Sequence, residues 1–318
     1  MSSHRLAASA YLLLALLIPA ALVLAQTKAK APVRRAQPPK FTKTEPFFDD
    51  AFATALQGER PADLGKGVAK SSGGNSATTP SASGDNAGSG WAAIIGPTAL
   101  EDEIKAQKLM ADMNVSTPSD LAGNGYKNAR RDFTVAAMIF GIISEYDGDV
   151  RWKKEAPSQR DVFARTAANA KVGTTGVYNE AKLRKQDLTD LIGGQAVQVR
   201  EAEPKTKWGE LINRTPLMQR LDISRDTKIK AWTAAAGDFN ANLDQLAHEA
   251  QIFAAIGQVL QKEGLESADD AEYRKFATML ATGGKELAAA CKEKNLDNAG
   301  KAANLIVNSC EKCHEGYR

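Results

Sequence analysis

The residues best suited to chemistry stand at the C-terminal end, where the segment 310–314 reads CEKCH. Two cysteines three positions apart, followed directly by a histidine, form the attachment signature of c-type haem. On a helix both thiols lie on one face, so they can bond the two vinyl groups of one porphyrin. His314 can then offer a ring nitrogen to the iron. We expect one covalent haem c per chain, held by Cys310 and Cys313, with Ile306 packed on the macrocycle one turn earlier.

Three other roles for these side chains suit the sequence less well. A thioredoxin-like thiol pair belongs in an α/β fold, whereas this chain has the pattern of a helical protein. A zinc site needs further ligands, and beyond the N-terminal segment only Cys291 and His248 remain. A disulfide between Cys310 and Cys313 alone would leave His314 without a role. We predict that Cys291 is a buried, unreactive thiol.

Composition favours a helical protein with room for two domains. The 318 residues are 43% hydrophobic and 25% charged but only 6% aromatic, with many alanines and leucines. A net charge of +3 argues against a nucleic-acid binder. Three cysteines are too few for a disulfide scaffold, and three histidines are too few for a multi-histidine metal centre.

The N-terminal part has the features of an export signal followed by a tether. Residues 7–25 are an apolar run that ends at a plausible cleavage position, so residues 1–25 are a predicted signal peptide. An uncleaved anchor is the alternative, because a run of this length just spans a bilayer. Residues 26–90 hold half of the 12 prolines and a tract of small polar residues, which predicts a disordered linker. The protein is therefore expected to be periplasmic or otherwise exported.

The rest of the chain has the pattern of two copies of one helical unit, 91–200 and 201–318. Identical residues recur first at an offset of 117 positions and then at an offset of 113. The pairs are Trp91/Trp208, Ile95/Ile212, Thr98/Thr215, Leu100/Leu217, Ala137/Ala250, Ile139/Ile252, Phe140/Phe253, Phe163/Phe276, Ala164/Ala277, Ala168/Ala281, Glu180/Glu293 and Leu183/Leu296.

Each copy is expected to form four helices joined by short connections. They are placed near 99–113, 125–147, 157–182 and 186–193, and near 216–231, 238–263, 268–292 and 297–316. Thr215, Ser267 and Asp297 are the expected N-caps in the second copy. Short connections imply antiparallel neighbours, which predicts an all-α fold of two tandem four-helix bundles.

The end of the chain, 310–318, resembles the class II c-type cytochromes, the cytochrome c′ family. There a C-terminal Cys-x-x-Cys-His, followed by x-x-Tyr-Arg, stands on the last helix of a four-helix bundle. The family also has the pattern Arg-x-x-x-(Met or Leu) on its first helix, on the distal side of the haem, which Arg214 and Met218 fit. The resemblance implies that Met218 is a sixth iron ligand and that Arg318 pairs with a propionate or shields His314.

Alternatives stay open at each of these positions. Met218 could be an ordinary core methionine. His248 could be a rival sixth ligand, or a surface or core histidine. Arg318 could extend into solvent as the last residue.

The first copy carries no haem motif. At the 113 offset the three haem positions correspond to Val197, Arg200 and Glu201, none of which can attach haem. We expect a haem-less bundle that packs on the second copy as a covalent pseudo-dimer or docks a partner. The segment 146–154 is either a docking loop or a solvated turn.

The predicted function is electron transfer by an exported mono-haem cytochrome rather than an enzyme, since only His248 is at hand as a distal acid–base group. Binding of a small gas such as NO or CO is the alternative, and it requires Met218 to be off the iron. Redox proteins or a gas ligand are the expected partners. A homodimer is a further option, and membrane contact is expected only with an uncleaved N-terminal segment.

Overall fold

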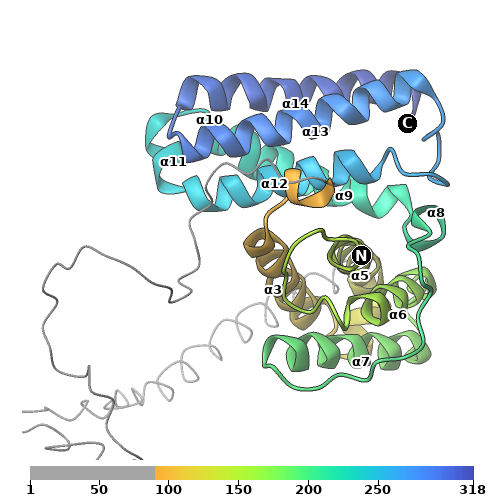
Figure 1. Cartoon of the computed structure of the whole chain (residues 1–318). Coiled ribbons are helices and arrows are strands. Elements are labelled where there is room, and N and C mark those ends of the chain that lie inside the picture. Colours follow the sequence, from red (N-terminus) through yellow and green to blue (C-terminus); the bar gives the residue numbers. More distant parts are fainter. Residues whose placement is uncertain (1–89) are drawn as a thin grey trace, which may run out of the picture. The chain divides into compact units, whose positions relative to one another are not determined.

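The computed structural model describes residues 90–318, which form helices and the loops that join them (Figure 1). The all-α prediction is thus confirmed for this part of the chain. The predicted signal peptide and almost all of the predicted linker lie outside the described residues. Between Gly90 and Arg318 no helix is long and apolar enough to cross a membrane.

The first copy is built around one buried helix. Its elements are η1 (Gly90–Ala93), α3 (Pro97–Asn114), α4 (Pro118–Asp120), the π-helix η2 (Leu121–Gly125), α5 (Tyr126–Ser144), α6 (Ala156–Asn169) and α7 (Thr175–Ile192). α5 packs against α3, α6 and α7. Because these neighbours cover α5 on several sides, every residue from Asp132 to Ile143 is buried.

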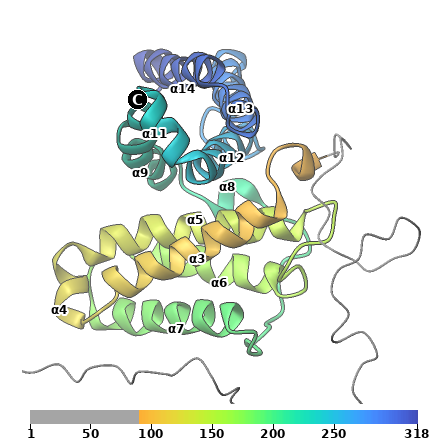
Figure 2. The same cartoon turned by 90° about the vertical axis from the view of Figure 1, so that its left-hand side faces the viewer.

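The second copy is a set of helices that run side by side, and Figure 2 looks along them. They are α8 (Trp208–Leu211), α9 (Arg214–Ser224), the π-helix η3 (Arg225–Lys230), α10 (Ala231–Thr233), α11 (Ala236–Ala241), α12 (Leu243–Val259), α13 (Ala271–Lys292) and α14 (Leu296–Gly316). α13 packs between α12 and α14, while α9, η3 and α10 cover the remaining side.

The prediction of helices over 157–182 and 186–193 is wrong, because residues 170–174 are not helical and separate α6 from α7. Thr174 caps α7 there by accepting a hydrogen bond from the Val177 N–H. Gly173 packs so closely that a β-carbon on it would lie 2.4 Å from Cα of Ala122.

This break also changes which residues of the two copies correspond. Glu180/Glu293 and Leu183/Leu296 are not equivalent, since the first member of each pair lies within α7. Aligning the starts of α7 and α14 places Thr189, Ile192 and Gly193 opposite the haem motif. The first copy therefore still lacks the motif, and the positions named from the 113 offset lie in the connector after α7.

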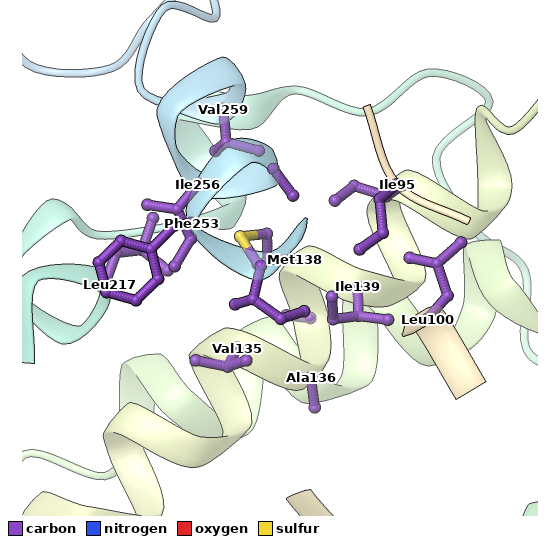
Figure 3. Close-up of a cluster of buried hydrophobic side chains, with 14 of the residues drawn as sticks. Ile95, Leu100, Val135, Ala136, Met138, Ile139, Leu217, Phe253, Ile256 and Val259 are labelled. Carbon is purple, nitrogen blue, oxygen red and sulfur yellow. The ribbon is translucent and has the colours of Figure 1, made fainter. Parts of the chain in front are cut away.

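The two copies pack against each other through corresponding helices. α5 lies against α9, and α12 lies against α3. Trp91 and Trp208, which correspond, have ring centroids 5.7 Å apart. Figure 3 draws Met138 of the first copy in one buried cluster with Leu217 and Phe253 of the second. Packing of a surface on its own counterpart is the arrangement of a two-fold dimer.

Both copies, residues 90–318, belong to one compact unit. The boundary between 91–200 and 201–318 stays a prediction. The segment 146–154 is anchored rather than free, since Tyr146 and Trp152 are buried and donate hydrogen bonds of 3.0 Å to carbonyl oxygens of Ile95 and Leu191.

Glycines allow α12 and α13 to approach closely. A β-carbon on Gly257 would lie 2.6 Å from the backbone nitrogen of Ala281, and one on Gly284 would lie 2.6 Å from that of Ala254. We expect Gly257→Ala to lower the free energy of unfolding in urea by about 1–3 kcal/mol, because the added methyl group would force the backbones of α12 and α13 apart. Gly300→Ala on α14 is the control, since its site has nothing within 4 Å, and it should stabilise by about 0.5–1 kcal/mol. Equal losses in both variants would contradict this explanation.

Candidate functional site

Helix α14 presents the Cys-x-x-Cys-His motif in its last turns. Asn295 starts the helix by accepting a hydrogen bond from the backbone of its first turn. Cys310 and Cys313 lie half-buried against the hydrophobic core, and His314 is exposed. Ile306 is fully buried one turn earlier and faces α13, where a β-carbon on Gly283 would lie 2.8 Å from its Cγ1.

Both thiols are free and protonated at neutral pH. Burial raises the pKa of Cys310 and of Cys313, and nearby arginines offset only part of that rise. A redox-active thiol pair depends on a lowered pKa, so the thioredoxin-like alternative has no support here. Across residues 90–318 no group of three or more histidine, cysteine or acidic side chains is placed to hold a metal ion.

Helix α9 approaches the end of α14 at Arg214. The Arg214 Cζ lies 5.8 Å from the ring centroid of Tyr273, and the Tyr273 ring lies 5.3 Å from that of Tyr317, the residue that ends α14. Residues four apart share a helix face, so Met218 belongs to the same face of α9 as Arg214. Met218 is half-buried and packs on the core.

Two buried polar atoms near Cys313 have no hydrogen-bond partner among residues 90–318. They are Nη1 of Arg214 and the hydroxyl of Tyr273, whose side chain is 2% exposed. The Arg214 Cζ lies 5.8 Å from the centroid of the Tyr273 ring, and its Nη2 pairs with Glu266 at 3.1 Å. Burial raises the pKa of Tyr273, so the hydroxyl keeps its proton and remains a donor.

Arg214 lies beside the Tyr273 hydroxyl and works to lower its pKa, against the larger effect of burial. A carboxylate could accept hydrogen bonds from both side chains. Haem carries propionate carboxylates, so the residues present here fit the cofactor that the motif implies.

Aromatic side chains complete the surroundings of the motif. The Tyr273 and Tyr317 rings meet edge to face with centroids 5.3 Å apart, and Phe276 lies 6.4 Å from Tyr317. The carboxylate of Asp270 raises the pKa of Tyr317 to about 12. Arg318 is exposed beyond the end of α14.

The other two sequence candidates are found in α12 and α13. Nε2 of His248, on α12, lies 3.3 Å from Oε2 of Glu103 in the first copy, so this histidine contacts the interface between the copies. Cys291 on α13 is buried, as predicted, and burial raises its pKa to about 11.

Sequence reasoning missed Tyr273. Tyr273 lies in the first turn of α13, after the N-cap Asp270, and its ring meets Tyr317 at the end of α14. The unpaired hydroxyl could be recognised only in the folded chain.

Comparison of the chain with known protein families, with curated proteins and with solved structures finds no match. The resemblance to class II c-type cytochromes therefore depends on the motif at 310–318 and on Arg214 and Met218.

Proposed function

We propose that this protein is an exported mono-haem c-type cytochrome that transfers electrons. Cys310 and Cys313 would bond the haem and His314 would be the proximal ligand. The observation that carries the proposal is the half-buried, free thiol pair on one face of α14, directly before an exposed histidine. Export is proposed from residues 7–25.

The finer fold belongs to the same proposal. In the second copy α9, α12, α13 and α14 would form a cytochrome c′-like four-helix bundle, and α3, α5, α6 and α7 would form its haem-less counterpart. The helix contacts described above support this grouping.

The chain's own residues would hold the cofactor and control its surroundings. A bound haem supplies an iron that cycles between the ferrous and ferric states. The thiols fix the ring to α14, and Arg214 and Tyr273 provide donors for a propionate. Met218, on the same face of α9 as Arg214, would be the sixth ligand, and its thioether would then exclude gas ligands.

The optical spectrum of the purified protein tests this function. We expect haem that stays attached in acid-acetone, a low-spin spectrum in both oxidation states, and no spectral shift on adding carbon monoxide. Absence of covalent haem would refute the proposal. A high-spin spectrum that shifts with carbon monoxide would favour the alternative, binding of NO or CO at an open distal site.

Replacing the proposed sixth ligand should open that site. Met218→Leu is expected to convert the low-spin spectrum to a high-spin one that shifts on adding carbon monoxide, because leucine fills the volume but cannot bind iron. Met113→Leu is the control, since Met113 is 69% exposed on the first copy, and it should leave the spectrum unchanged. A Met218→Leu spectrum identical to wild type would show that another group is the sixth ligand.

A further inference from the structure

A buried carboxylate of the first copy reaches into the second. Glu103 on α3 is fully buried. Its two oxygens accept hydrogen bonds from Nε and Nη2 of Arg220 at 3.1 and 3.2 Å. Gln107 donates a further hydrogen bond of 2.8 Å to Oε1 of Glu103. A two-point contact between guanidinium and carboxylate fixes orientation as well as distance.

Arg220 joins the first copy to two helices of the second. It belongs to α9, and its Nη1 donates to Glu249 of α12 at 2.9 Å. Lys228 of η3 also pairs with Glu249. Burial works to lower the pKa of Arg220, but Glu103 and Glu249 outweigh it and raise the pKa, so the guanidinium is permanently charged.

α9 therefore has two faces with different contacts. The residues on the side of Arg220, which include Leu217, Leu221 and Ser224, are buried. The face with Arg214 and Met218 approaches the end of α14, where Arg214 lies against the Tyr273 ring and that ring meets Tyr317. Because a helix turns as a unit, holding Arg220 fixes the rotation of α9 and with it the direction of Met218.

The contact requires two different copies. Glu103 and Arg220 occupy equivalent positions of the two copies, 117 residues apart. Each copy therefore contributes the residue at this position to the interface between the copies. A second haem-bearing copy in the place of the first would bring arginine where Glu103 stands, and like charges would then meet in a buried site. The first copy has an acid where the second has a base.

We infer that the haem-less copy is a positioning module for the haem site. Through Glu103 it holds α9, and so Met218, against the cysteine face of α14. Glu103 is a positioning residue, because it acts through Arg220 and does not touch the motif. This inference rests on the proposed function for its effect on the iron, but the effect on α9 can be measured without haem.

The first test uses the full-length holoprotein with Glu103→Gln, which keeps the side-chain size and removes the charge. We expect the ratio of Met-free to Met-bound iron, measured by carbon monoxide binding, to rise by about 2- to 30-fold. Glu101→Gln, a partly exposed position of the same helix, should leave the ratio unchanged. Arg220→Lys keeps the charge but loses the two-point contact, so it should also raise the ratio. This variant replaces Glu103→Gln as the test if Glu103→Gln does not fold.

Hydrogen exchange separates this inference from the proposed function. In the haem-free chain, Glu103→Gln should speed exchange of α9 amides severalfold while leaving α13 unchanged. Unchanged α9 exchange would overturn the inference whether or not the wild type carries haem. Faster α9 exchange without any change in carbon monoxide binding would show that Glu103 stabilises α9 but does not position Met218. That result would also overturn the inference. A wild type without haem would refute the proposed function alone.

Discussion

Replacing Cys310 and Cys313 together by alanine is expected to remove all covalent haem while leaving the helices intact. Both side chains are only half-buried, near the end of α14, so the loss of two sulfur atoms opens no large internal cavity. Haem content after acid-acetone extraction, with far-ultraviolet circular dichroism on the same sample, measures both parts of the expectation.

The third cysteine provides the matched control. Cys291 is buried on α13, and burial raises its pKa to about 11, so Cys291→Ala should keep the full amount of covalent haem. Haem that remained covalently attached to the Cys310/Cys313 double variant, or that was lost from Cys291→Ala, would contradict the assignment of the attachment site.

Arg220→Leu is expected to cause a large loss of stability, because it acts on the interface between the copies. It leaves the buried carboxylates of Glu103 and Glu249 without their shared partner, and breaking a buried pair in this way costs about 3–5 kcal/mol. Unfolding in urea at pH 7 gives the value. Arg165→Leu is the control, because the Arg165 side chain is 52% exposed and its partner Glu180 is 22% exposed, and pairs that water reaches contribute about 0–1 kcal/mol.

The loss should depend on pH in a defined direction. Burial alone would raise the pKa of Glu249, but Arg220 and Lys228 outweigh it and lower the pKa to about 2. A lowered pKa stabilises the fold fully above the unfolded value of about 4.3, and the stabilisation is lost as pH falls toward 2. The difference between wild type and Arg220→Leu should therefore shrink from pH 7 to pH 3. A difference that grew on acidification would contradict the pairing.

The sequence predicted those features that depend on residues close together along the chain. Hydrophobic periodicity predicted helices throughout 90–318, and the placement of α13 and α14 was correct to within three residues. The N-caps were not found where expected, because several residues could cap each helix. The structure uses Asn213, Asp270 and Asn295 in place of Thr215, Ser267 and Asp297.

Features that depend on distant residues could not be predicted. The break at Gly173 follows from its contact with the backbone of Ala122, which no local pattern records. The motif at Cys310 was evident from spacing alone. The pairing of Glu103 with Arg220, and the unpaired hydroxyl of Tyr273, arise only when the helices have assembled.

The contact between Trp91 and Trp208 joins parts of a single polypeptide. Arg160 also ties down the connector between the copies by donating hydrogen bonds to Glu203 and Thr206. Two such surfaces on separate chains dissociate when the protein is dilute. A short tether between them instead gives each surface an effective concentration of its partner in the millimolar range. The interface that orients α9 is therefore present in every molecule, however few molecules the cell makes.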